Sequence, residues 1–249
     1  MRRSERRILR RPVVGLLVAA LVVALAAVSV IGARGMQASA ANAVVKQGAF
    51  PGWSYKAVRE EDGFVLSKVT YDSNSVAGVK AYAGANADLA QRLIGQGQPT
   101  LDVEITFRRL LSAEKLRDVV GHSGLPLARI AGYHMRAVGA DGQWLTMGGG
   151  PANGELIGQR EVIDKQMANV RRHTPDAQFQ GVAYIEATLT PAEYQRLAAD
   201  GRVFMIDVTK TLIRAEVGKV VPLKRPHDIG FDVATPFWVM QQLGLENFR

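Results

Sequence analysis

The sequence predicts an α+β domain preceded by one membrane-spanning helix, and three observations lead to this fold class. The first is a single long apolar run near the amino terminus of the 249-residue chain. The second is a pair of strand–helix–strand units whose helices begin with similar capping patterns. The third is the composition, with 47% hydrophobic and 22% charged residues and no cysteine, which suits a domain that folds around a core without disulfides.

The apolar run at residues 13–33 has the length and composition of a transmembrane helix. It carries no charged residue and consists mostly of Val, Leu and Ala. About 20 such residues, at ~1.5 Å each, cross the ~30 Å hydrocarbon core of a bilayer. Residues 1–12 contain six arginines, and positively charged flanks stay in the cytoplasm. We therefore expect a single-pass protein of the cell membrane with a cytoplasmic amino terminus and an extracytoplasmic carboxyl-terminal domain.

A cleaved signal peptide is the competing interpretation of this run. Ala38, Ser39 and Ala40 fit the small-residue pattern at which such peptides are cut. The run is longer than the apolar segment of about 7–15 residues in signal peptides, and Arg34 lies between it and the candidate site. We favour a retained signal-anchor, and both interpretations export the rest of the chain.

The net charge of +8 belongs mostly to the flank of the apolar run. With Glu5 as their only acid, residues 1–12 contribute +5 of it, and the rest of the chain contributes +3. A nearly balanced exported region does not have the concentrated basic surface that nucleic acid requires. We therefore expect no nucleic-acid partner.

The exported region divides into a linker and one domain. Residues 34–60 are mostly small and polar, which is typical of a juxtamembrane linker, and we expect Trp53 and Tyr55 within it to be packed. The domain is expected at residues 61–249. Hydrophobic periodicity predicts strands at residues 64–71, 103–108, 127–136, 181–189 and 203–208, and helices at 73–95 (with candidate breaks at Gly78 and Gly84) and beginning at Ser112 and Thr190.

The helix starts of the two strand–helix–strand units are the strongest local signals. In the second unit the Thr190 hydroxyl can accept a hydrogen bond from the Glu193 N–H, while the Glu193 carboxylate reaches back to Thr190. Pro191 occupies the first helical position, where its missing N–H costs little. In the first unit Ser112 is the cap, and Glu114 lies in the first turn, where negative charge suits the helix dipole.

Two such units side by side predict a split βαβ sheet of the ferredoxin-like type. We expect a four-stranded antiparallel sheet in a core at residues 101–209, with the first and third strands central and both helices on one face. Residues 137–178 are interpreted as an insertion whose Gly-rich start cannot continue a strand and which contains a helix at about 155–172. The tail from Thr209 is expected to add one strand and a short terminal helix near Pro236.

The second unit resembles a known family. Its segments at residues 181–184, 189–193 and 197–203 are similar to the second half of subtilisin-type propeptides and related protease inhibitors. A looser similarity extends over residues 101–209. The resemblance implies a ferredoxin-like fold and, as a function, protease inhibition, although the chain departs from that family in its insertion and its anchor.

The titratable residues form no motif that predicts catalysis or metal binding. The histidines are His122, His134, His173 and His227. None has another histidine or a carboxylate at a metal-binding spacing on a helix, so surface or loop positions are expected. Glu104, Thr106 and Arg108 alternate with apolar residues and are expected on the solvent face of their strand. We therefore predict no catalytic, metal-binding or cofactor-binding residues, and no cofactor.

Three further segments are basic or rich in glycine. Residues 147–151, Met-Gly-Gly-Gly-Pro, could offer N–H groups to an anion, but the Lys-Ser/Thr ending of a phosphate loop is missing, so a flexible turn is favoured. Residues 171–173 are expected at the wet end of a helix. A basic loop, which we expect to be solvated and for which anionic lipid or wall polymer is the alternative contact, contains Lys219, Lys224, Arg225 and His227.

Three functions from different classes remain open on the sequence alone. The leading hypothesis is a non-enzymatic binding or regulatory module at the outer face of the membrane, with an unidentified protein or envelope partner. The second is a protease-inhibitor-like or propeptide-like domain. The third is a cell-envelope enzyme with an unfamiliar motif, which a pocket that gathers ionisable groups with displaced pKa values would favour.

Overall fold

The computed structural model describes residues 43–149, 160–223, 225 and 228–249. The apolar run at residues 13–33, its basic flank and the candidate cleavage site at residues 38–40 lie outside these ranges. Among the described residues, no helix is both long enough and apolar enough to cross a membrane.

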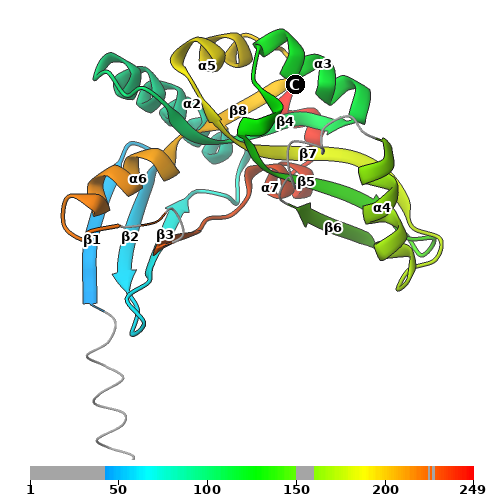
Figure 1. Cartoon of the computed structure of the whole chain (residues 1–249), viewed down its shortest axis with the longest axis horizontal. Coiled ribbons are helices and arrows are strands. Elements are labelled where there is room, and N and C mark those ends of the chain that lie inside the picture. The colour runs from blue at the N-terminus through cyan, green and yellow to red at the C-terminus, as the bar shows by residue number, and fades with distance from the viewer. Residues whose placement is uncertain (1–42, 150–159, 224, 226–227) are drawn as a thin grey trace, which may run out of the picture.

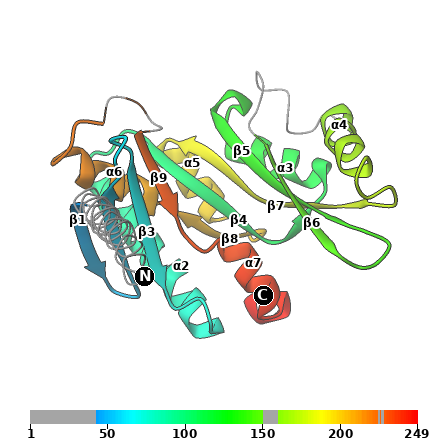
Figure 2. The ribbon, with the colours of Figure 1, turned by 90° about the horizontal axis from the view of Figure 1, so that it is seen from below.

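The described chain has an α+β structure with two sheets (Figure 1 and Figure 2). The smaller sheet has the strand order β1-β2-β3-β9. Its strands are β1 (Ala43–Phe50), β2 (Trp53–Arg59), β3 (Val65–Tyr71) and β9 (Ile229–Asp232). The first three pair antiparallel, whereas β9 returns from the carboxyl-terminal part of the chain and pairs parallel with β3.

The prediction of a linker at residues 34–60 is wrong for the described part of that range, which forms β1 and β2. Trp53, Tyr55 and Ala57 alternate with more exposed residues along β2 and are buried, which is the period of a strand with one covered face. The expectation that both aromatic residues are packed is therefore confirmed. β1 is a largely exposed strand at the edge of its sheet. Its sequence therefore lacks the apolar alternation by which a strand is recognised.

Helix α2 (Val76–Gly95) follows β3 and begins at Ser75, whose side chain accepts a hydrogen bond from the Gly78 N–H at 3.0 Å. The helix is continuous, so the candidate breaks at Gly78 and Gly84 are not observed. Glycine at position 78 serves a close approach, since a Cβ there would lie 2.3 Å from the Asp72 carbonyl oxygen.

The larger sheet has the strand order β6-β5-β7-β4-β8, and every neighbouring pair is antiparallel. Its strands are β4 (Leu101–Leu111), β5 (Ile130–Val138), β6 (Trp144–Gly149), β7 (Gln178–Leu189) and β8 (Val203–Asp207). Four of these were expected from the two strand–helix–strand units, and the first and third of the four, β4 and β7, lie next to each other at the centre. The chain enters β5 through a short 3-10 turn, η1 (Leu127–Arg129).

Strand β6 corrects the interpretation of the Gly-rich segment. Met147, Gly148 and Gly149 pair with Met135, His134 and Tyr133, so this part of the 147–151 segment forms a strand instead of the favoured flexible turn. Glycine fits at this edge because a Cβ at Gly148 would lie 2.9 Å from the His134 ring. The last two residues of the segment, 150 and 151, lie outside the described ranges.

Helices α3 (Ala113–Ser123) and α5 (Pro191–Ala198) contact each other and lie on one face of the larger sheet (Figure 1). Both predicted caps are present. The Ser112 side chain accepts from the Lys115 N–H, and Thr190 and Glu193 form the reciprocal capping box. Local sequence therefore fixes where each helix starts, and their apolar stripes fix the face of the sheet that they cover.

The insertion and the tail differ in part from expectation. Helix α4 (Arg160–Arg171) is the described part of the helix expected at residues 155–172. The tail begins with a helix that was not predicted, α6 (Thr209–Gly218), whose Ile213 and Val217 are buried. After β9, the chain ends in α7 (Pro236–Gln242) and the 3-10 helix η3 (Leu245–Phe248), in agreement with the expected strand and short terminal helix.

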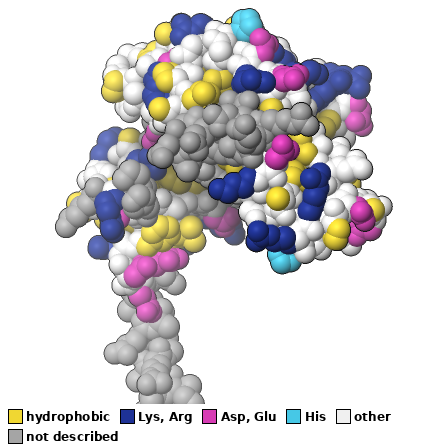
Figure 3. Space-filling model, turned by 45° about the vertical axis from the view of Figure 1, so that its right-hand side comes forward, with side chains coloured by type: hydrophobic (Ala, Val, Ile, Leu, Met, Phe, Trp, Pro, Cys, Tyr) yellow, Lys and Arg dark blue, Asp and Glu magenta, His cyan; other side chains and the backbone are white. Residues whose placement is uncertain are grey.

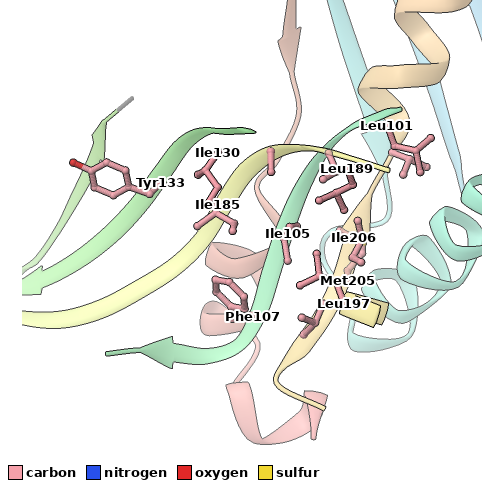
Figure 4. Packing of buried hydrophobic residues seen from close by; sticks show 14 of the residues in the cluster. Leu101, Ile105, Phe107, Ile130, Tyr133, Ile185, Leu189, Leu197, Met205 and Ile206 are labelled. Atoms are coloured by element: carbon pink, nitrogen blue, oxygen red, sulfur yellow. The ribbon is translucent and has the colours of Figure 1, made fainter. Parts of the chain in front are cut away.

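One cluster of buried side chains runs through both sheets, from Trp53 in the smaller sheet to Ile185 in the larger one. Figure 4 shows its part between the central strands and α5, where Ile105, Leu189 and Leu197 lie. The two sheets therefore share one core, and polar side chains that this core encloses are removed from water.

Candidate functional site

A row of carboxylates crosses the larger sheet. Glu104 in β4 lies directly opposite Asp207 in β8 and Glu186 in β7. Opposite side chains of antiparallel strands are about 4.5–5.5 Å apart at Cβ, so the three carboxylates share one face. Lys210, in the first turn of α6, places its Nζ 2.7 Å from Oε1 of Glu186. We call Glu104, Glu186, Asp207 and Lys210 the acid–lysine cluster.

Asp207 and Glu104 differ in their hydrogen bonds. Asp207 accepts from the Tyr82 hydroxyl at 2.8 Å and from the Thr209 N–H and hydroxyl at 2.8 and 2.5 Å. Glu104 is only 5% exposed, and its Oε1 has no hydrogen-bond partner among the described residues. A buried carboxylate without hydrogen bonds is costly, and protonation relieves that cost.

The pKa values in the cluster follow from this burial. Burial is the largest cause that raises the pKa of the Glu104 carboxyl to about 8. The Lys210 ammonium opposes this shift, and the Asp207 carboxylate adds to it. Burial also acts on Lys210, but the Glu104 and Glu186 carboxylates outweigh it and raise the Lys210 pKa. Near pH 7, Glu104 is therefore mostly protonated and Lys210 is charged.

Aromatic side chains pack on the buried side of the cluster, at Asp207, whereas the Glu186 side chain on the other side is 36% exposed. The Tyr71 and Tyr82 rings stack with centroids 4.1 Å apart, and the Tyr71 hydroxyl donates to the Ala234 carbonyl at 2.8 Å. Burial raises the Tyr82 pKa well above its ordinary value, so its phenol stays a donor to Asp207. Because Tyr71 belongs to β3 and Ala234 precedes α7, these contacts tie the smaller sheet and the carboxyl-terminal segment to the cluster.

Two expectations about side-chain position are wrong at this face. Glu104 and Thr106 were expected in solvent but are 5% and 0% exposed, because α6 and α7 pack against β4. His134 was expected on the surface or in a loop but lies in β5, half-buried, with its ring stacked 4.1 Å from that of Tyr184. Burial lowers the pKa of His134.

The acid–lysine cluster differs from an open active site. None of its four residues lines any of four cavities of 900, 570, 540 and 380 Å³ that the described residues form. No group of three or more His, Asp or Glu side chains in the described part of the chain is arranged to hold a metal ion. The Lys210 ammonium already supplies a cation to the carboxylates.

A second charged region lies at the rim of the larger sheet, beside η3. A cavity of 540 Å³, which we call the rim pocket, is lined by Arg108, Arg109, Leu110, Leu111, Lys115, Gly201, Arg202, Leu245 and Arg249. None of these lining residues is acidic. Figure 3 shows, by contrast, that basic and acidic side chains are interspersed over one face of the molecule. The rim pocket is therefore a local concentration of positive charge.

A bulge in β4 builds this pocket. Thr106 pairs with Tyr184 and Leu111 with Val182, so residues 107–110 of β4 lie opposite the single residue Ala183 of β7. The extra residues have no partner in β7, and three of them, Arg108, Arg109 and Leu110, line the pocket.

The bulge depends on glycine in the partner strand. Gly181 has φ +144°, and a Cβ there would lie 2.8 Å from the Leu111 carbonyl oxygen. Only glycine accommodates both the dihedral and this close approach.

The cations of the rim pocket are not equivalent. Arg108 donates to the Phe248 carbonyl at 2.6 Å and lies over the Phe204 ring, so it holds η3 in place. Arg202 forms ion pairs with Asp200 and Asp118. Arg109, Lys115 and Arg249 are exposed, and their side chains have no ion pair with any described residue. These three cations are therefore available to an external anion.

The other residues considered from the sequence do not join either region. His122 is exposed and pairs with Asp118, four residues earlier in α3. Arg172 and His173 are exposed after the end of α4, as expected. In the expected basic loop, Lys219 pairs with Glu216 and Arg225 pairs with Asp228, while Lys224 and His227 lie outside the described residues.

Comparisons with models of known protein families, with curated proteins and with solved structures found no match to this chain.

Proposed function

We propose that the chain is a membrane-anchored, extracytoplasmic binding or regulatory module without enzymatic activity. The observation that carries this proposal is the separation of two kinds of charged group. The carboxyl group with a pKa near neutral, that of Glu104, is buried in the acid–lysine cluster, whereas the open rim pocket presents mainly arginine. Arginine does not lose its proton in proteins, so it can hold an anion but cannot act as an acid or a base.

The envelope-enzyme alternative has one observation in its favour, the pKa of Glu104 near 8. A general acid or base must come within hydrogen-bond reach of the substrate, directly or through one water. Glu104 is 5% exposed, and α6 and α7 pack against its strand, which favours a structural role for it. Catalysis at this residue would require these helices to move away from β4.

The anchor remains a proposal based on residues 13–33 and on the arginines before them. Membrane fractionation followed by protease treatment of intact cells tests it. We expect the chain in the membrane fraction, with the region after Gly35 digested from outside and the basic end spared. A protected domain would contradict the orientation, and a mature protein that starts at Ala41 would contradict the retained anchor.

We also propose that residues 101–209 have a ferredoxin-like fold with β6 as an added edge strand. The order β5-β7-β4-β8, the antiparallel pairing and the placement of α3 and α5 on one face support this assignment. They also support a second candidate function, because the same fold is implied by the resemblance to subtilisin-type propeptides. Incubation of the full chain with subtilisin, followed by a peptidase assay, decides between them. We expect no inhibition, and stoichiometric inhibition would establish the second candidate.

A further inference from the structure

We infer that the rim pocket binds an amphiphilic anion, meaning one phosphate or carboxylate head group joined to a short apolar portion. The inference rests on the proposed function, because it names the ligand class of that binding module. Its basis is the combination of an anchored bulge, three unpaired cations and an apolar wall around one cavity.

The cavity is part of the fold and not a gap between mobile side chains. Residues 107–110 leave the β-ladder at the bulge, and the Gly181 backbone packs against Leu110 and Leu111. On the other side, Arg108 fixes η3 through the Phe248 carbonyl. A pocket fixed on both sides needs little reorganisation to receive a ligand, which favours affinity.

Charge defines the head group. Arg109 and Lys115 are exposed and unpaired among the described residues, and no acidic side chain lines the pocket. Arginine and lysine together bind phosphate and carboxylate through charge-assisted hydrogen bonds. Arg202 adds a further cation, although Asp200 and Asp118 already neutralise it.

Size and lining define the rest of the ligand. The volume of 540 Å³ lies within the range of about 300–1,000 Å³ found for small-molecule sites. Inorganic phosphate fills only a small part of this space. Leu110, Leu111 and Leu245 form the apolar wall, and Leu110 and Leu245 continue into a buried apolar cluster around Phe237. An apolar portion next to the anion therefore gains from burial.

The position of the pocket favours a ligand from solution over a lipid of the same bilayer. Figure 1 shows the carboxyl terminus, next to η3, at the top of the molecule and the start of β1 at its lower left. The proposed anchor precedes β1, so the rim pocket lies away from the strand that the anchor joins. A lipid head group and a soluble anion offer the same chemistry, and binding to anionic vesicles distinguishes them.

The test is calorimetric titration of the full chain, held in nanodiscs of neutral lipid, with hexyl phosphate. We expect saturable binding that weakens with added salt. Inorganic phosphate and hexyl glucoside, which carry the charge or the apolar chain alone, should each bind at least about tenfold more weakly. Equal binding of either compound, or no binding of hexyl phosphate, would overturn the inference.

Variants locate the site. Arg109→Gln with Lys115→Gln should weaken hexyl phosphate binding by at least about tenfold. The matched control is Arg92→Gln with Arg172→Gln, which removes the same charge from exposed positions outside the pocket and should leave affinity unchanged. An equal loss in both double variants would show a long-range charge effect and overturn the site. The melting temperature of each variant confirms that it folds.

Two further experiments identify whether the ligand comes from a lipid or from solution, and test ligand binding separately from the absence of enzymatic activity. Vesicles that contain phosphatidic acid, bound only when Arg109 and Lys115 are intact, would support the ligand class and identify a lipid source. An acidic peptide that binds more tightly than hexyl phosphate would overturn it. Release of inorganic phosphate from bound hexyl phosphate would instead contradict the non-enzymatic function while the binding site stands.

Discussion

The acid–lysine cluster is mainly acidic and largely buried, whereas the rim pocket is lined by basic side chains and is open to water. In the cluster, Glu104 lies between two other carboxylates, and Tyr82 and Lys210 bind those neighbours. In the rim pocket, Arg109 and Lys115 face solvent without partners among the described residues. Desolvation makes each missing partner costly inside the protein, whereas water solvates an unpaired surface cation. We therefore expect substitutions in the buried cluster to change the stability of the fold, and substitutions in the exposed rim pocket to change ligand binding.

The largest effect is expected from Asp207→Ala. The substitution leaves the Tyr82 hydroxyl and the Thr209 N–H buried without their acceptor. Unpaired buried donors cost about 1–3 kcal/mol each, so the free energy of unfolding should fall by about 3 kcal/mol or more. Chemical denaturation measures it, with Asp88→Ala on the exposed side of α2 as the control. A loss no larger than that of the control would show that the cluster does not stabilise the fold.

Gly181→Ala should have the next largest effect because it acts on the bulge that forms the rim pocket. The dihedral φ of +144° and the 2.8 Å approach to the Leu111 carbonyl both oppose a side chain there. We expect a loss of about 2 kcal/mol in the free energy of unfolding, together with weaker hexyl phosphate binding. Gly201→Ala is the control, because Gly201 lines the same pocket but has no atom within 4 Å of an added Cβ.

The dependence of stability on pH reports on Glu104. Its pKa is raised to about 8 in the folded state from 4.5, so the folded state holds a proton that the unfolded state releases. The contribution of Glu104 to the free energy of unfolding is therefore fully present below about pH 4.5. It falls as the pH rises from there through about 8. His134, whose pKa is lowered, acts in the opposite direction only below about pH 6.5.

Denaturation at pH 7 and pH 9 therefore isolates the contribution of Glu104. We expect the free energy of unfolding to fall by about 1–2 kcal/mol between these pH values. Glu104→Gln, which stays neutral, should remove most of this slope. An unchanged slope in the variant would mean that Glu104 is not the group that titrates.

The smallest change in stability is expected from Arg109→Gln with Lys115→Gln. These side chains form no ion pair with the described residues and are exposed, so their removal should leave the melting temperature unchanged or slightly raised through lower charge repulsion. Calorimetry of the unliganded protein measures it. A clear loss of stability would show that the rim cations hold the fold together and would weaken their assignment to binding.

The sequence alone determined the local elements of the larger sheet. The Ser112 cap and the Thr190–Glu193 capping box were predicted and are present, because each depends on residues only three apart. The same holds for β7, whose predicted range of residues 181–189 lies within the observed strand. The sequence failed at α6 and β6, where a helix follows a strand without a cap signal and glycines pair at a sheet edge.

Tertiary structure decided what covers each face. Alternation along β4 distinguishes the two faces of the strand, but it does not say that the face with Glu104 and Thr106 is also buried. That burial comes from α6 and α7, which pack against β4 although they lie about 100 residues or more further along the chain. The rim pocket likewise needs Gly181 opposite the bulge of residues 107–110. Local periodicity records which residues share a face, whereas the site depends on contacts between segments distant in sequence.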